Sequence, residues 1–263
     1  EYLKNRGINI NLASRAKRYL GYCKGDKIAV SKNADKERVL AILFHEFAHK
    51  IHSEIEPDKF KKGGTLNKIF NTTEEKQIES ELIRLTHFVD ENSLCLELNK
   101  MKNEYKEKVK KREEILKQKY PDFKKSQKFP EYEKYVKKNK CKSKYLLKHD
   151  CVKFITPILR REEIYSVENL DKDFPNMNED FKTYIRLMSD YRKQKRIQNR
   201  ISKLQRYYAT PTELFARFVE GLIIDINTTR RIAPTAFNHF KLCVNLGYYK
   251  DLKDVLDMAG ISI

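Results

Sequence analysis

The sequence predicts an α+β fold that is mostly α-helical, with a small edge sheet and a long basic helical insertion. Three observations predict it. Apolar residues recur at spacings of three and four over several stretches, which indicates amphipathic helices. Residues 26–32 alternate apolar and small side chains, as a strand does. Charged residues make up 35% of the 263-residue chain, which is too many for a compact globule throughout and indicates an extended, solvated part.

Basic residues are concentrated in the middle of the chain. Residues 100–148 contain 19 Lys or Arg and 7 Asp or Glu, and residues 186–206 contain 8 and 1, while the whole chain has a net charge of +18. We expect a core built from residues 1–60 and 205–263, interrupted by a helical, Lys-rich insertion or arm over residues 61–204. Such an arm suits nucleic acid or an acidic protein as a partner, and it also fits a solvated helical hairpin that has none.

Several elements of the core can be placed in order. A short helix is expected within residues 8–20, followed by a turn over residues 21–25 and a strand over residues 26–32. Asp35 is suited to cap the helix that follows. Near the other end, Thr210, Pro211 and Glu213 fit the first positions of a strongly apolar helix. A last short helix is expected over residues 252–258.

The arm is expected to contain long helices. Thr72–Glu75 is a capping box that starts a helix running to about residue 90. Apolar residues then keep an approximate heptad step over residues 94–116, and a second long basic helix is indicated over residues 181–204. Because each long helix has only one narrow apolar face, we expect the two to pack antiparallel. The Lys-rich residues 120–150 are expected to form a loop or a short helix.

Residues 41–51 contain His45, Glu46 and His49 in the pattern H-E-x-x-H. Residues i and i+4 lie on one face of a helix, so both imidazoles can point at one metal ion. Glu46 is close enough to hold a metal-bound water and take its proton. The flanking residues are apolar, which predicts a buried helix whose polar groups need a partner such as zinc. The alternative is a core helix that carries two histidines by chance.

An ion that stays open for catalysis needs a third protein ligand, and the sequence offers rivals. Glu79 and Glu81 follow His49 by 30 and 32 residues, whereas Glu213 follows it by 164. Glu213 could instead close its capping box or pair with Arg217 one turn later. We favour Glu213, because the helix that follows is apolar enough to pack in the core beside the H-E-x-x-H helix. His52 lies too far along the helix to share the ion easily.

Three segments resemble the zincin-like metallopeptidase domains of large polyvalent proteins, which phages and conjugative elements carry. They are residues 21–32, the motif at residues 45–49, and residues 207–220, which read YYATPTELFARFVE. The resemblance covers about residues 10–55 and 205–260. It implies a gluzincin-type peptidase that hydrolyses a peptide bond in a protein substrate, as an endopeptidase rather than an exopeptidase.

The resemblance also implies roles for particular residues. His45, His49 and Glu213 would hold Zn²⁺, and Glu46 would be the general base. Tyr207, Tyr208 and Arg217 become candidates for stabilising the transition state or supporting the ligands, although each also fits an ordinary packing or salt-bridge role. The basic middle of the chain has no counterpart in the resemblance. The alternative is a nucleic-acid-binding protein of a mobile element with a structural or vestigial zinc site, but such a site would not need Glu46.

The remaining features concern compartment and processing. Five scattered cysteines without a C-x-x-C pair predict reduced thiols, so we expect a cytoplasmic protein in a bacterial or host cell. No run of 18 apolar residues predicts a membrane span. The chain begins with Glu1 rather than Met, so we expect it to be an excised piece or a processed product.

Overall fold

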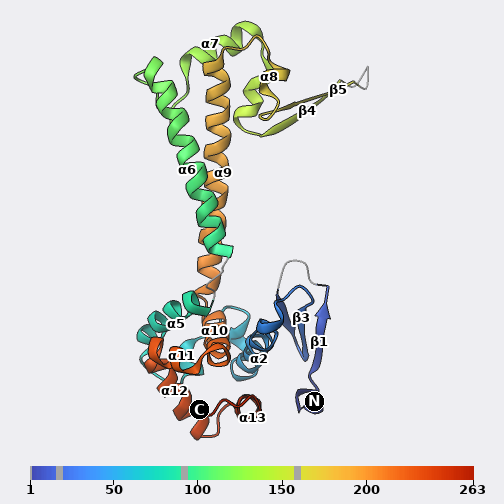
Figure 1. Cartoon of the computed structure of the whole chain (residues 1–263), viewed down its shortest axis with the longest axis vertical. Coiled ribbons are helices and arrows are strands. Elements are labelled where there is room, and N and C mark those ends of the chain that lie inside the picture. The colour runs from blue at the N-terminus through green and yellow to red at the C-terminus, as the bar shows by residue number, and fades with distance from the viewer. Residues whose placement is uncertain (1, 16–19, 90–93, 157–160) are drawn as a thin grey trace. The chain divides into compact units, whose positions relative to one another are not determined.

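The computed structural model describes residues 2–15, 20–89, 94–156 and 161–263 (Figure 1). The chain divides into two compact units, which are Glu1–Asn92 with Leu204–Ile263, and Ser93–Lys203. The predicted division is therefore wrong for residues 61–92, which belong to the first unit and not to the arm. The reason is the helix α5 (Glu75–Val89), whose buried Ile78, Leu82 and Leu85 join the apolar core of that unit.

The first unit contains a three-stranded sheet of β1 (Asn9–Ser14), β2 (Gly21–Lys24) and β3 (Lys27–Ser31). The strand order is β1-β3-β2, with β1 parallel and β2 antiparallel to β3. The strand predicted over residues 26–32 is confirmed as β3. Among the described residues, β2 pairs with β3 alone, so it is an edge strand of this sheet.

Two predictions near the N-terminus are wrong. Residues 9–14 form the strand β1 and not a helix. Ile8, Ile10 and Leu12 are spaced by two, which places them on one face of a strand. Residues 16–19, the end of that expected helix, lie outside the described residues. The turn expected over residues 21–25 is mostly the strand β2, and only Gly25, with φ +57°, adopts the left-handed conformation that a tight hairpin turn requires.

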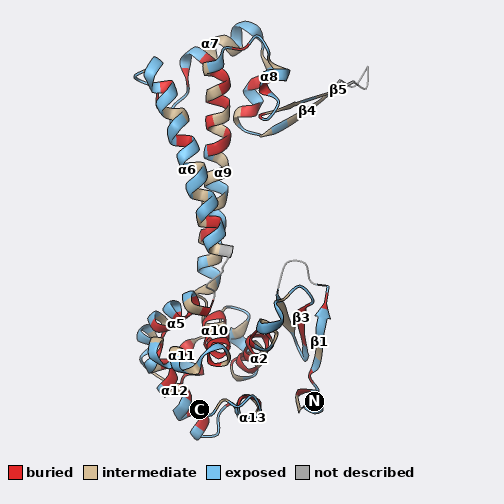
Figure 2. Ribbon diagram, viewed as in Figure 1, coloured by how far each residue is buried: buried red, intermediate tan, exposed pale blue. Residues whose placement is uncertain are grey.

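The H-E-x-x-H helix forms as predicted. A short 3₁₀ turn, η1 (Lys36–Arg38), leads into α2 (Val39–Ile55), and the Asp35 side chain accepts a hydrogen bond from the backbone N–H of Glu37. The flanking Phe44, Phe47 and Ala48 are buried, and Figure 2 shows buried residues of α2 in red.

The centre of the first unit is α10 (Pro211–Ile224), which packs against α2, α5 and α11 (Ile226–Ile232). Its buried side chains include Leu214, Phe215 and Phe218. The helices predicted from residues 72 and 210 are confirmed, and the last predicted helix corresponds to α13 (Lys250–Met258). The sequence did not indicate α12 (Pro234–Asn245) or the short helices α1 (Tyr2–Asn5), α3 (Pro57–Phe60) and α4 (Leu66–Ile69).

The second unit contains two long helices, α6 (Leu94–Lys119) and α9 (Glu179–Tyr208). The last residues of α9, from Leu204 on, belong to the first unit. They lie side by side in Figure 1. Arg112 of α6 pairs with Asp190 of α9 at 2.8 Å, and Lys119 pairs with Asp180. From the first pair to the second, the residue number rises along α6 and falls along α9. The two helices are therefore antiparallel, as predicted.

The rest of the second unit closes one end of this helix pair. It contains α7 (Pro130–Asn139), the 3₁₀ helix η2 (Lys142–Leu147), α8 (Leu170–Asp173) and a hairpin of β4 (Cys151–Thr156) with β5 (Arg161–Ser166). The hairpin was not predicted. Phe129, Tyr132, Phe181 and Tyr184 belong to an apolar cluster that shares no residue with the core of the first unit.

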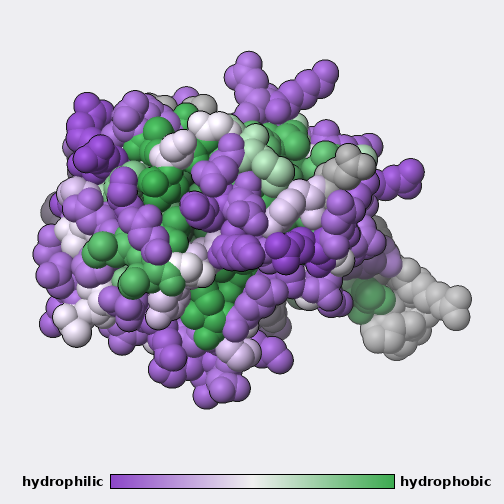
Figure 3. All heavy atoms as spheres, turned by 90° about the horizontal axis from the view of Figure 1, so that it is seen from below, coloured by the Kyte–Doolittle hydropathy of each residue, from purple (hydrophilic) through white to green (hydrophobic). Residues whose placement is uncertain are grey.

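The surface is mixed in polarity. Figure 3 shows hydrophobic atoms, in green, reaching the surface among hydrophilic ones. Leu242 of α12, Leu246 directly after it and Met258 of α13 are exposed. Apolar atoms supply roughly half of the accessible surface of folded proteins, so these residues do not by themselves indicate a partner. Within the described ranges, no helix has the length and apolar content that crossing a bilayer requires.

Candidate metal centre

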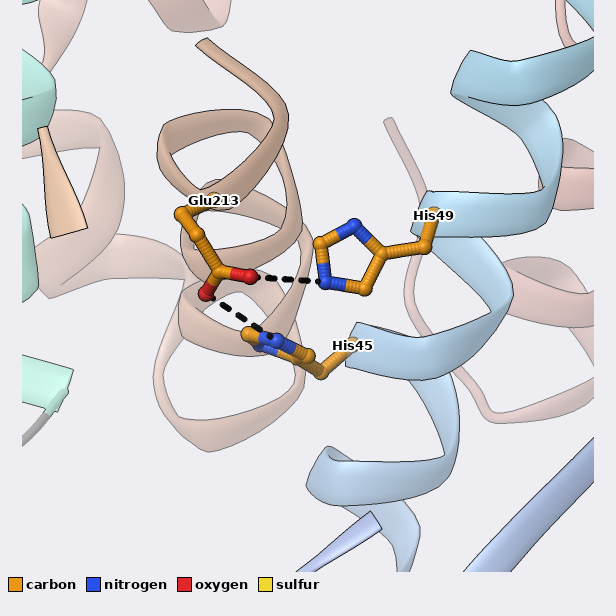
Figure 4. Close-up of side chains that lie close together, drawn as sticks. All are labelled: His45, His49 and Glu213. Carbon is orange, nitrogen blue, oxygen red and sulfur yellow. Dashed lines mark ion pairs between the residues drawn. The ribbon is translucent and has the colours of Figure 1, made fainter. Parts of the chain in front are cut away.

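His45 and His49 of α2 face Glu213 of α10, as Figure 4 shows. The Nε2 atom of His45 lies 3.6 Å from Oε2 of Glu213, and Nε2 of His49 lies 3.1 Å from Oε1. One ligand atom from each of the three residues lies within 4.8 Å of the others. Two neighbouring turns of one helix and the first turn of another therefore bring three metal-ligand side chains to one point.

The three side chains lie close enough together to share one small ion. With metal–ligand bonds of about 2.0–2.1 Å, two ligand atoms of a tetrahedral site lie about 3.3 Å apart. The histidine–carboxylate distances are of this size, at 3.6 Å to Oε2 of Glu213 and 3.1 Å to its Oε1. Two imidazole nitrogens and a carboxylate oxygen are also a donor set that zinc takes in proteins. The group can therefore hold a metal ion.

Glu213 is held as a buried carboxylate. Burial raises its pKa, but the hydrogen bond with His49 and the charges of both histidines outweigh burial and bring the pKa to about 2. The hydroxyl of Tyr207 also donates a hydrogen bond to Oε1 of Glu213. The capping role considered for Glu213 is wrong, since Thr210 makes no side-chain cap bond and the carboxylate faces the histidines.

The rival ligands Glu79 and Glu81 are not part of this group within the described residues. Glu81 is buried, and its Oε2 accepts hydrogen bonds from the backbone N–H groups of Thr235 and Ala236, at 2.9 and 3.1 Å. It therefore satisfies the first turn of α12, where backbone donors lack helical partners. His52 is also not a member, because it lies fully buried beside Glu56.

Glu46 lies beside the ligands at the wall of a cleft. Burial raises the pKa of its carboxyl group, and the positive charges of His45 and His49 oppose that rise only in part. The backbone of Gly21 in β2 passes close to it, since a Cβ atom on Gly21 would lie 2.8 Å from Oε1 of Glu46. Glycine therefore allows the edge strand to approach the carboxylate.

The cleft has a volume of about 620 Å³. Its lining comprises residues of the β2–β3 hairpin, the H-E-x-x-H helix, the end of α3 with Lys61, the end of α9 and the start of α10, namely Gly21, Tyr22, Cys23, Gly25, Glu46, His49, Ser53, Phe60, Lys61, Tyr207, Thr212 and Glu213. Lys24 and Lys27 flank a two-residue turn and lie opposite each other in the register of β2 and β3. Because hydrogen-bonded pairs alternate along such a ladder, the N–H and C=O groups of Gly21 and Cys23 point away from β3.

Glu220 is the functional candidate that sequence reasoning missed. Its carboxylate lies 3.0 Å from Nδ1 of His45, and it accepts hydrogen bonds from Arg38 at 2.8 Å and Arg217 at 2.9 Å. A carboxylate only accepts, so Nδ1 of His45 carries a hydrogen; in the neutral imidazole the lone pair is then on Nε2, the nitrogen that faces Glu213. Burial raises the pKa of Glu220, but His45 and the two arginines lower it to about 2.

A sequence signal for Glu220 did exist. It follows Glu213 by seven residues, which is two turns along the same face of one helix.

Tyr207, Tyr208 and Arg217, the candidates for stabilising the transition state or supporting the ligands, have different positions in the structure. Tyr207 lines the cleft and contacts Glu213, whereas the Arg217 guanidinium lies over the Tyr208 ring, 5.3 Å from its centroid, and pairs with Glu220. Arg217 and Tyr208 therefore support the carboxylate that orients His45.

Comparison of the chain with protein-family models, with curated proteins and with solved structures finds no match in any of the three. Arguments about function therefore depend on the geometry of the site and on the residues that form it.

Proposed function

We propose that this protein is a zinc-dependent peptidase that cleaves a peptide bond within a protein substrate. One observation carries the proposal. His45, His49 and Glu213 converge beside the buried Glu46, on a cleft whose wall is an edge strand. Two helices and a strand thus bring a metal-ligand set, a proton acceptor and a backbone-binding edge to one place.

The residues divide the chemistry among themselves. His45, His49 and Glu213 would hold Zn²⁺, which when bound polarises a carbonyl group and makes water more acidic. Glu46 takes the proton of the attacking water and passes it to the leaving nitrogen, a role suited to a carboxyl group whose pKa is raised. Tyr207 lines the same cleft, and its hydroxyl group can donate to the oxygen on which charge develops once its one hydrogen is released from Glu213.

The edge strand supports a peptide as the substrate. An extended chain can add to an open sheet edge through backbone hydrogen bonds, and β2 presents the groups of Gly21 and Cys23 for this purpose. Such bonds recognise the backbone of any sequence. Selectivity would then come from the side chains around the cleft, among them Phe60 and Lys61.

A structural or vestigial zinc site is the competing interpretation. Structural zinc sites are usually closed by four protein ligands, whereas three side chains converge here among the described residues. A structural site also has no use for a buried carboxylate beside the ligands, where burial is costly. Glu46 and the adjoining cleft therefore favour a peptidase.

The test compares Glu46→Gln with the wild type. The amide cannot take a proton, so cleavage of an unfolded protein substrate should fall by about 10²–10⁴-fold, while zinc content measured by elemental analysis stays the same. The matched control is Glu54→Gln, which changes an exposed glutamate of the same helix that pairs with Lys50 and should leave both quantities unchanged. His45→Ala should lose both. Wild-type protein without zinc, or full cleavage by Glu46→Gln, would overturn the proposal.

A further inference from the structure

One face of α9 carries a row of cations. Lys193, Arg196, Arg200 and Lys203 follow one another at spacings of three, four and three, which places them on one side of the helix over about 15 Å. Arg196, Arg200 and Lys203 are exposed. No Asp or Glu occurs between residues 191 and 206. The row is therefore a strip of positive charge without acidic residues of its own helix segment.

The neighbouring helix α6 extends this strip. The Tyr105 ring of α6 has Nζ of Lys108 5.0 Å from its centroid and Nζ of Lys193, from α9, 5.9 Å from it. One aromatic ring thus gathers a cation from each helix. We call the surface formed by Tyr105, Lys108 and the four α9 cations the basic seam.

Few acidic residues pair with the α9 part of the seam, while Glu104 and Glu107 adjoin Tyr105 and Lys108 on α6. Asp190 pairs with Arg112 between the helices. Asp150 pairs with Arg192 at 2.6 Å and with Arg196 of the seam at 3.2 Å, and its charge also interacts with Lys193. A row of like charges raises the local positive potential, which an anionic partner relieves.

We propose that the basic seam binds the phosphodiester backbone of nucleic acid. Lysine and arginine neutralise phosphates, and the Tyr105 ring holds Lys108 and Lys193 beside the other cations of the row. This function is separate from peptide cleavage, since all seam residues belong to the second unit.

Other anionic partners fit less well. A protein interface usually has an apolar centre, yet among the described residues 192–203 no large hydrophobic side chain is exposed. A helix that binds a membrane surface inserts an apolar face into it, but the apolar Ile201 of α9 is buried.

The experiment measures binding of the full chain to a labelled 20-base-pair duplex and to a 20-nucleotide single strand of mixed sequence, by fluorescence anisotropy across a salt series. We expect the logarithm of the binding constant to decrease linearly with the logarithm of the salt concentration. If the four α9 cations neutralise four phosphates, the slope should be about −3.6 or steeper for the duplex and about −2.8 or steeper for the single strand. The two slopes and affinities show which form the seam prefers.

Matched variants locate the contact. Changing Lys193, Arg196, Arg200 and Lys203 together to Gln should reduce the slope by about 3–4 and weaken binding by more than about tenfold at 0.1 M salt. The control changes four exposed lysines elsewhere in the same unit to Gln, namely Lys128, Lys134, Lys137 and Lys138. It removes the same charge and should have a much smaller effect. Circular dichroism verifies the fold of both variants.

Four results would overturn the proposal. These are no binding by the wild type at 0.05 M salt, an equal loss of binding in the control variant, competition by polyaspartate as effective as that by nucleic acid at equal charge, and tighter binding to phosphatidylserine vesicles than to either oligonucleotide. The salt slope of the wild type tests the proposal independently of any substitution.

Discussion

Glu220 is the residue whose contacts most directly support the candidate metal centre. Its carboxylate orients His45 and is itself held by Arg38 and Arg217. Glu220→Gln should lower zinc affinity by about 10–100-fold, the usual cost of losing such a support, as measured by competition with a chelator. Glu81→Ala is the control, because it removes another buried glutamate of the same core without touching the ligands. Equal zinc affinity in Glu220→Gln and wild type would contradict this role.

The choice of the third ligand gives a second prediction at the residue scale. Glu213→Ala should lower zinc affinity by orders of magnitude, because it removes one of three ligands. Glu79→Ala and Glu81→Ala should leave zinc affinity nearly unchanged. Glu81→Ala should still lower the free energy of unfolding by about 1 kcal/mol, since the first N–H groups of α12 lose their acceptor. A chelator titration and urea unfolding separate the two effects, and the reverse pattern of affinities would refute the assignment.

Gly21 carries a prediction about catalysis rather than metal binding. In Gly21→Ala the new methyl group would meet the Glu46 side chain, with Oε1 at 2.8 Å and Cγ at 2.9 Å, so the strand or the carboxylate must move. A displacement on the order of 1 Å costs about 10²-fold in rate, and zinc content should stay unchanged. Gly247→Asn is the control, because Gly247 is not part of the cleft lining, has nothing within 4 Å of its Cβ position, and Asn tolerates its positive φ. Full activity of Gly21→Ala would show that the approach is unimportant.

At the scale of the element, the C-terminal half of α2 contains a source of acid sensitivity. His52 is fully buried, and burial lowers its pKa to about 4, with Glu56 opposing and His49 adding to the shift. An unfolded chain protonates this histidine near pH 6.5. The contribution of neutral His52 to the free energy of unfolding is thus fully present above about pH 6.5. As the pH falls from there to about 4, the free energy of unfolding decreases by about 3 kcal/mol.

His52→Leu should remove much of this decrease. The measurement is urea unfolding of metal-free protein at pH 7.5 and 4.5, comparing the change in the free energy of unfolding with that of the wild type. His239→Leu, at a partly exposed histidine near Thr72, should leave the wild-type change nearly intact. An acid-induced loss as large in His52→Leu as in the wild type would assign the sensitivity to other groups.

The elements also show what the sequence could predict. The H-E-x-x-H helix and α10 were predictable, because helical periodicity and capping residues are local signals. Glu213 could be chosen because the apolar helix after it had to pack in the core. Glu220 was missed, since its role depends on Arg38, which lies 182 residues away. The hairpin of β4 and β5 was missed because lysine and glutamate interrupt the apolar pattern of two short strands, whose pairing and packing on the second unit are not local signals.

At the scale of the whole molecule, two units with separate apolar clusters predict two unfolding transitions. Zinc binds only the folded first unit in our proposal, so it should raise the melting temperature of one transition and leave the other in place. Differential scanning calorimetry with and without a chelator measures this. His45→Ala should abolish the shift. A single transition that moves as a whole would show that the units unfold together.

The separation of the ligands along the chain has a consequence for assembly. His49 and Glu213 are 164 residues apart, and the second unit lies between them. An ion held as we propose would close a very long loop, the kind of link for which loop-closure theory gives the largest gain. If the chain were cut within the second unit, α2 and α10 would lie on separate fragments. The proposed metal would then favour their reassociation.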